Sequence, residues 1–238
     1  MHLLEKLRLI LTHSTARLLY PNSTRLVIAS TGRAGSTMLT NAVAASLIKH
    51  KLGIETHTHL NYLLSRSSKE IVGRLRHINK YSAYICKTHD LYDKLNNKVK
   101  CKYIFIHGDP LDSAISVEQI VTKKGIQWFS QHQHHLHGSG EYKYIFQKDI
   151  LNYEGQLRSW MSHYDKDIYC VAYEDLWAQR SALSRFLGFE LVLPKKRERS
   201  KKRQPPNVNS DLFERLRKAR DAYSQQYIHL KAASLAEQ

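Results

Sequence analysis

Cysteine is scarce in this chain, and long apolar runs are missing. The three cysteines, Cys86, Cys101 and Cys170, are an odd number without close pairing, and each sits in an apolar run. This pattern excludes a disulfide-built scaffold and predicts buried, reduced thiols in a cytoplasmic protein. No run approaches the roughly 18 apolar residues of a membrane-spanning helix, and no uninterrupted signal-type core stands at the N-terminus.

Acidic residues are also few. The 238 residues include 37 Lys and Arg but only 21 Asp and Glu, which gives a formal net charge of +16. A strongly basic chain favours anionic partners: nucleotide phosphates, acidic or sulfated glycans, nucleic acid or acidic lipid. The excess is concentrated at 195–203, where seven of nine residues are Lys or Arg.

The most informative stretch is 26–39, LVIASTGRAGSTML. An apolar β-type run, 26–29, turns through 30–35 into a helical pattern over 36–49. Gly32 and Gly35 permit a tight turn and a close backbone approach, and the amides and dipole at a helix start attract phosphate. Arg33 adds a fixed charge, and Ser36 and Thr37 add hydroxyls. No Lys stands between Gly35 and Ser36, so this is not a Walker A loop. A ligand-free strand–turn–helix is the alternative.

Strand and helix patterns alternate along the rest of the chain. Strands are predicted at 53–59, 81–87, 102–107 and 167–172, and helices at 61–78, 111–123, 148–164, 174–187 and 211–230, with Pro110 in a first turn. Residues 124–146 are predicted to be irregular. The alternation predicts one α/β domain built on a parallel sheet with crossover helices. Ligands of such sheets bind at the carboxyl ends of strands, which places Arg33, His89 and Asp109 on one rim.

Lys87-Thr88-His89 follows an inner strand, at a position that suits catalytic groups. A neutral imidazole can take a proton from a hydroxyl near pH 7, and a lysine two residues earlier can offset developing negative charge. The alternative is that His89 only caps the next turn.

Four stretches together resemble the sulfotransferases that use 3′-phosphoadenosine 5′-phosphosulfate (PAPS). They are the Gly32–Thr37 loop, Lys87-Thr88-His89, the strand leading to Asp109-Pro110, and Tyr173-Glu174-Asp175-Leu176 with Phe186-Leu187-Gly188. Their order and spacing fit from about residue 25 to 189. The resemblance implies a P-loop NTPase-like parallel sheet flanked by helices, the sulfotransferase fold.

The same resemblance implies roles for individual residues. The phosphosulfate would be held by the loop Gly32, Arg33, Ala34, Gly35, Ser36 and Thr37, and the 3′-phosphate by Ser116. His89 would deprotonate the acceptor hydroxyl, and Lys87 would lie beside the transferred sulfuryl group. No metal is expected.

Gly108 departs from the family pattern, which has Arg-Asp-Pro-Arg where this chain has Gly-Asp-Pro-Leu. The arginine that grips the 3′-phosphate is therefore missing. We expect another cation, either His107 or one from 195–203, to replace it; weakened donor affinity and a degenerate family member are the alternatives.

The remaining segments leave alternatives open. Residues 1–24 are expected to form an N-terminal amphipathic helix, which packs on the domain or lies on an anionic membrane surface. Residues 25–194 form the α/β domain, and 195–238 a basic segment and a helix packed on it. His132, His134, His135 and His137 favour a lid or acceptor-binding loop over a zinc site. Four nearby aromatic residues have two possible roles, stacking on the sugar rings of an acceptor or ordinary packing in the domain: Trp128, Phe129, Tyr142 and Tyr144.

The sequence thus predicts a cytoplasmic sulfotransferase that transfers a sulfuryl group from PAPS to a carbohydrate or glycolipid hydroxyl, without a nucleic-acid partner. A small phenol or alcohol acceptor stays open. The alternative to an enzyme is a non-catalytic protein of the same fold that binds a nucleotide or a polyanion. A kinase is disfavoured by the absent Walker lysine and the lack of a clear magnesium-binding motif.

Overall fold

The computed structural model describes residues 24–80, 83–92, 100–162, 165–196, 205 and 207–236. The predicted N-terminal helix and residues 197–203 of the basic run lie outside these ranges. Five strands form one sheet in the order β2-β3-β1-β4-β5, and every pairing is parallel. The strands are β1 (Arg25–Ser30), β2 (Lys69–Ile71), β3 (Ile85–Thr88), β4 (Cys101–His107) and β5 (Ile168–Ala172).

Helices cover both faces of the sheet. They are α2 (Ser36–Leu52), α3 (His59–Ser67), α4 (Pro110–Lys124), α5 (Ile126–His135), α6 (Tyr153–Met161), α7 (Arg180–Leu187) and α8 (Ser210–Ala236), with 3-10 turns η1 (Leu75–Lys80) and η3 (Tyr142–Tyr144). This arrangement confirms the predicted α/β class and the P-loop-like parallel sheet.

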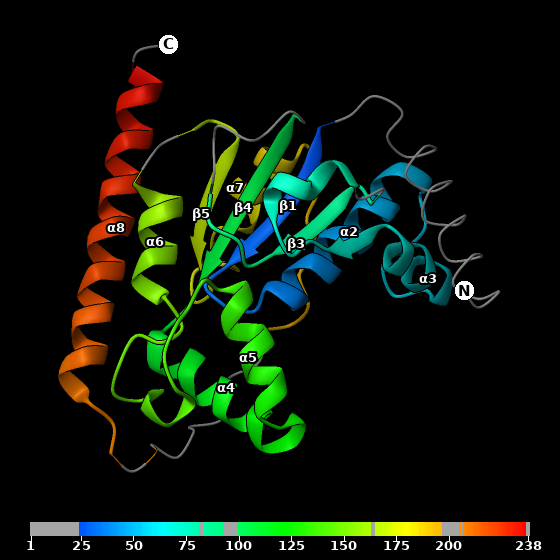
Figure 1. Ribbon diagram of the computed structural model, residues 1–238. Coiled ribbons are helices and arrows are strands. Elements are labelled where there is room, and N and C mark those ends of the chain that lie inside the picture. The colour runs from blue at the N-terminus through cyan, green and yellow to red at the C-terminus, as the bar shows by residue number, and fades with distance from the viewer. Residues whose placement is uncertain are drawn as a thin grey trace.

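Alternation along the central strand β1 builds two cores. Val27 and Ala29 point to the side covered by α4, α5, α6 and α8, where Trp160 is fully buried. Leu26 and Ile28 point to the opposite side, which α2 and α7 cover. Figure 1 shows α6 and α8 side by side on the first face, and α4 and α5 beyond the end at which β1 turns toward α2.

All three cysteines are buried free thiols, as predicted. Burial raises the pKa of Cys86 to about 12 and raises the pKa values of Cys101 and Cys170. They therefore stay protonated thiols at neutral pH and act as small apolar side chains in the core.

Several predicted elements are wrong. Residues 53–59 form no strand: Gly53 ends α2 in the left-handed conformation, and the Thr58 hydroxyl caps α3 by accepting from the Asn61 amide at 3.2 Å. The helix predicted at 61–78 stops at Ser67, and the short edge strand β2 pairs with β3. Strand pairing outweighed a helical pattern there.

The segment predicted to be irregular, 124–146, contains helix α5. Two predicted helices are shorter than expected: α6 begins at Tyr153 rather than 148, and α7 at Arg180 rather than 174. Asp149 fixes the first boundary, because its carboxylate accepts from the Tyr153 and Glu154 amides at 2.8 and 3.0 Å. No described helix combines the length and apolar character that crossing a membrane requires.

Candidate active site

The loop between β1 and α2 has an unusual backbone. Gly32, Arg33 and Gly35 all have positive φ, at 74°, 55° and 86°. Gly35 is the N-cap of α2 and, having no side chain, caps none of the first amides. Four amides at a helix start lack intrahelical partners, and this end of the helix dipole is positive. Uncapped amides at the start of a helix are groups that attract anions in proteins.

Beside this helix start lies a pocket of about 800 Å³. It collects most of the residues to which the sequence analysis assigned roles: Arg33, Gly35, Ser36, Thr37, Lys87, His89 and Ser116. They come from the β1–α2 loop, the start of α2, the end of β3 and the middle of α4. Residues 83 positions apart in the chain thus meet in one cavity because parallel strands end at the same edge of the sheet.

Two predicted loop residues lie behind the pocket wall. Ala34 is 1% exposed and faces Gly108, whose added Cβ would lie 3.6 Å from the Ala34 Cβ. Gly32 lies against α5, where a Cβ would approach the Leu136 side chain to 3.0 Å and His132 Nε2 to 3.3 Å. Both residues let the loop pack closely rather than line the cavity.

Two cation–hydroxyl pairs lie in the pocket. Lys87 Nζ donates to the Thr37 hydroxyl at 2.8 Å, at the start of α2. Arg33 Nε donates to the Ser116 hydroxyl at 3.0 Å, on α4. Burial and the nearby Arg33 charge lower the pKa of Lys87 to about 8. Each pair thus joins a cation to a hydroxyl in the same pocket.

His89 is held in a defined tautomer. Its Nδ1 lies 3.1 Å from the Ser30 carbonyl oxygen and 3.0 Å from the Ser30 hydroxyl. Because a carbonyl only accepts, Nδ1 carries the hydrogen and Nε2 keeps its lone pair. Burial and the Lys87 charge lower the pKa of His89 to about 4, so the ring is neutral at pH 7.

Asp109 lies on the same rim, but its carboxylate is used in hydrogen bonds that hold helices α4 and α8. Its carboxylate accepts from the Leu111 and Asp112 amides, which caps α4, and from Arg217 Nε of α8 at 2.7 Å. Burial opposes ionisation, but these bonds outweigh it and lower the pKa of Asp109. Asp109 thus positions the helix that carries Ser116.

His107 is not the cation expected beside Gly108. It is 2% exposed, and burial lowers its pKa to about 3, so it is neutral. Of the basic run, Lys195 and Lys196 lie within the described ranges, and Lys196 Nζ donates to the Glu174 carbonyl at 3.2 Å. Two cations of the pocket lie at α4: Arg33, which donates to Ser116, and Lys124 in the last turn of the helix.

The far wall of the pocket combines residues that the sequence analysis considered for acceptor binding, Trp128, His132 and His135, with two to which it gave no role, Tyr173 and Ile71. The first three belong to α5, whereas Tyr173 follows β5 and Ile71 lies in β2. The buried residues Phe129, His132 and Leu136 are spaced by three and four, which is a helical pattern that the His-rich composition concealed. The four clustered histidines thus belong to α5 and the turn after it, not to a loop without secondary structure.

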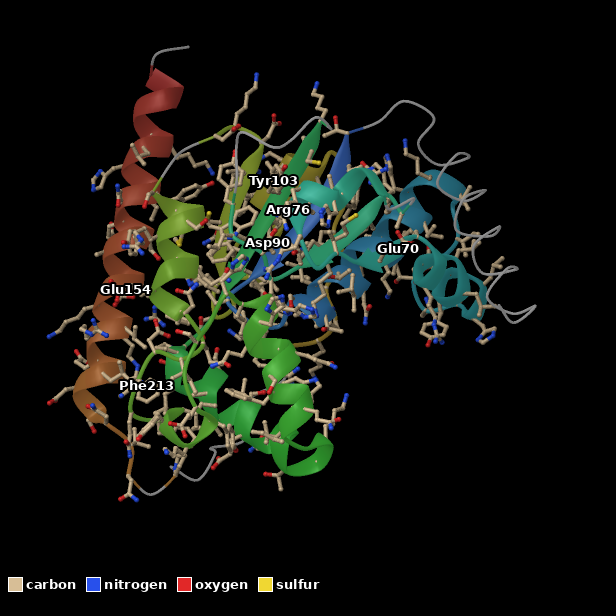
Figure 2. The ribbon with its side chains drawn as sticks, in the orientation of Figure 1. Glu70, Arg76, Asp90, Tyr103, Glu154 and Phe213 are labelled. Carbon is tan, nitrogen blue, oxygen red and sulfur yellow. The ribbon has the colours of Figure 1, made fainter. Side chains whose placement is uncertain are left out.

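The four histidines of this segment do not point toward one common site. His134 and His137 contact Arg74, and His137 also contacts Asp90. Figure 2 labels Asp90 in the middle of the view, over the strands of the sheet. Within the described ranges, no group of three or more His, Cys, Asp or Glu side chains is arranged to hold a metal ion.

Comparisons with known proteins add one structural similarity. No family model matches the chain, and no curated protein sequence matches it. Among solved structures, the chain is similar to retinol dehydratase in a crystal structure with androsterone and the inactive cofactor PAP. The two chains are 15% identical, and the match covers 89% of this chain and 68% of that chain with a TM-score of 0.39. The fold class stated above therefore stands on the strand order and register of this chain.

Proposed function

We propose that this protein transfers a sulfuryl group from PAPS to the hydroxyl of an acceptor. The observation that carries the proposal is that one pocket joins an uncapped helix start, two cation–hydroxyl pairs and a neutral, oriented imidazole. Each part serves one requirement of the transfer: binding two anionic groups, offsetting charge on the transferred group, and accepting a proton.

The Lys87–Thr37 pair and the first amides of α2 bind the phosphosulfate. Bound PAPS supplies an activated sulfuryl group, whose nucleotide phosphate is the leaving group. Negative charge grows on that phosphate during the transfer, and a lysine in a partly buried site stabilises it more strongly than water does. As in phosphoryl transfer, positioning and charge neutralisation provide most of the catalysis.

The Arg33–Ser116 pair binds the 3′-phosphate. The sequence analysis assigned Arg33 to the phosphosulfate, but its hydrogen bond to Ser116 supports a role beside that residue instead. Gly108 supplies no cation there, and His107 is neutral, whereas Arg33 Nε already lies 3.0 Å from the Ser116 hydroxyl. Arg33 adopts a left-handed backbone with φ of 55°, which is uncommon for a residue with a side chain. We infer that this conformation directs the guanidinium toward α4, where it takes the place of the arginine missing at 108.

His89 removes the acceptor proton. With Nδ1 bound to Ser30, Nε2 is the nitrogen that accepts a hydrogen bond from the acceptor hydroxyl. The aromatic and apolar wall of Trp128, Ile71 and Tyr173 borders the space for the acceptor. Such a wall fits a sugar ring of a carbohydrate or glycolipid, and it also fits a phenol or another small alcohol.

The decisive experiment is a transfer assay with sulfur-labelled PAPS, a panel of glycans, glycolipids and phenols, and excess EDTA. We expect label on at least one hydroxyl acceptor, and EDTA should not reduce it. Parallel reactions with labelled ATP and magnesium test the kinase alternative. Tight PAPS binding without transfer to any acceptor would instead favour the non-catalytic binding protein.

A further inference from the structure

His132 occupies an unusual position for a polar side chain. It is 8% exposed, and its Nε2 is buried without a hydrogen-bond partner. The ring stacks on Trp128, with centroids 4.7 Å apart and planes 16° apart. Its edge-to-face neighbour is His89, at 5.4 Å between centroids. An apolar ring would pack here without burying an unpaired nitrogen, so packing alone does not explain a histidine.

The surroundings of the two imidazoles disfavour a lasting positive charge on His89. The ionisable groups with the largest effect on the two rings, besides the rings themselves, are Lys87 on β3, Arg33 in the loop and His135 on α5, and all of them disfavour a positive charge. Burial and these neighbours lower the pKa of His132 to about 3, so His132 is also neutral. A proton taken up by His89 is therefore short-lived there. Because the pKa of His132 is lower still, a proton that passes to this neighbouring ring stays on it only briefly before it reaches water.

The distance between the rings suits a proton transfer. Two imidazoles joined by an N–H···N bond of about 3 Å have centroids roughly 5 Å apart. The observed 5.4 Å between centroids therefore needs little translation. The rings lie edge to face at 86°, so the His132 ring has to turn out of its stack on Trp128 while Ser30 holds His89 in place. Rotation about the second side-chain torsion of histidine allows that turn.

The backbone holds the pair at this separation. Buried Gln156 of α6 donates from one amide nitrogen to the His89 carbonyl at 2.8 Å and to the Leu136 carbonyl at 3.0 Å. It thereby ties the end of α5 to the residue that follows β3. Gly32 allows α5 to approach the loop, because a Cβ there would crowd both Leu136 and His132.

We propose that His132 is the proton acceptor that discharges His89 after each transfer; the proposal rests on the proposed sulfuryl transfer. The acceptor O–H bond breaks as its oxygen bonds to sulfur, and the proton goes to His89 Nε2. That proton then passes to a nitrogen of His132, which returns it to water at the pocket mouth, where His135 is exposed. The cycle leaves both imidazoles neutral and consumes no other reactant.

The test uses His132→Phe and His132→Gln in the full chain, with His134→Gln as the control. Phe keeps the ring stack on Trp128, and Gln keeps a hydrogen-bond acceptor, but neither carries a proton. We expect both to lower kcat at least tenfold with unchanged affinity for adenosine 3′,5′-bisphosphate, and free imidazole buffer to restore much of the rate. The control residue faces Arg74 outside the pocket, so its replacement should leave kcat within twofold of wild type.

A second readout does not depend on turnover. Nitrogen-15 NMR of the imidazoles should show that the titration midpoint of His89 falls in His132→Phe, because the protonated ring loses its acceptor, while His132→Gln retains it. Wild-type kcat and an unmoved His89 midpoint in His132→Phe would overturn the proposal. If the wild-type protein transfers no sulfuryl group but the His89 midpoint still depends on His132, the proposed function is refuted. The coupling between the two imidazoles is then still supported.

Discussion

Burial sets the charge state of the ionisable side chains in the pocket. Lys87 is charged below a pKa of about 8, whereas His89 stays neutral down to about 4. Between these values the site holds a cation for an anionic group and a base for a hydroxyl at the same time. The two residues thus perform opposite tasks although only Thr88 separates them.

Replacing His89 should separate chemistry from binding. His89→Gln removes the accepting imidazole nitrogen, so we expect turnover to fall by about 10²-fold or more, the contribution typical of a general base. Calorimetry with adenosine 3′,5′-bisphosphate should give an affinity within threefold of wild type. Near wild-type turnover would remove His89 from the mechanism, and lost affinity would mean that the ring supports the pocket instead.

Because Lys87 loses its charge at alkaline pH, we expect nucleotide affinity to fall as the pH rises. Above its pKa of about 8 the amine loses its charge, so affinity for an anionic nucleotide should fall as the pH rises from 7 to 9. Lys87→Arg keeps the charge over this range and should flatten the profile. The measurement is calorimetry across pH 6.5–9.5; identical profiles for the two proteins would show that Lys87 does not contact the anion.

The residues of the site that could be predicted from the sequence share a local signal. Arg33, His89 and Asp109 each follow a predicted strand closely, so strand prediction puts them on one rim, whereas Thr37 and Lys87 received their specific roles from the family resemblance. Their pairing partners could not be predicted, since the bonds from Arg33 to Ser116 and from Lys87 to Thr37 depend on how α2 and α4 pack. The charge of His107 depends on burial, which spacing does not show.

Among the elements, α2 is the one whose placement the pocket most requires. Its two ends are both glycines in the left-handed region, Gly35 at φ 86° and Gly53 at φ 68°. A Cβ at Gly35 would lie 2.5 Å from the Tyr173 ring, whereas a Cβ at Gly53 would meet nothing within 4 Å. The two positions therefore carry the same backbone strain but different contacts.

Alanine at each end separates these effects. Gly53→Ala should cost only the left-handed strain, roughly 1–2 kcal/mol of unfolding free energy, with unchanged nucleotide affinity. Gly35→Ala should cost more and should weaken nucleotide binding, because either Tyr173 or the start of α2 must move. Denaturant unfolding and calorimetry measure the two quantities; equal effects of both substitutions would contradict the close packing of the loop on Tyr173.

Element prediction succeeded where tertiary pairing and local pattern agree. The buried strands β1, β4 and β5 are short apolar runs followed by turn or capping residues, and they lie within one or two residues of their predicted bounds. The edge strand β2 has three residues whose strand conformation comes from pairing with β3. Helix α5 was missed because one of the three buried positions on its inner side is His132, and the surrounding His and Gln residues hide its spacing from Phe129 and Leu136.

At the scale of the whole molecule, several histidines are neutral inside a strongly basic protein. Burial lowers the pKa values of His89, His107 and His132 to about 4, 3 and 3, below the ordinary 6.5. The unfolded chain thus binds more protons than the folded one between these values and 6.5. Folding stability is therefore present above pH 6.5 and is lost as the pH falls toward the folded-state values.

We expect the unfolding free energy to decline by up to about 1.4 kcal/mol per pH unit for each of these histidines below pH 6. Guanidinium unfolding at pH 7.5, 6.0 and 5.0 measures the slope. His107→Phe removes one buried imidazole. The variant should therefore lose the contribution of one histidine to this slope, up to about 1.4 kcal/mol per pH unit. A stability that does not change between pH 7.5 and 5.0 would contradict the burial of these rings.

The proposed function requires the pocket to bind a nucleotide with two separated anionic groups. Titration calorimetry with adenosine 3′,5′-bisphosphate, with adenosine 5′-phosphate as the control, tests it most directly. The account predicts tight binding of the bisphosphate and an affinity at least tenfold lower for the monophosphate, because only the former engages both Lys87–Thr37 and Arg33–Ser116. Equal affinity for the two nucleotides, or no binding of either, would contradict it.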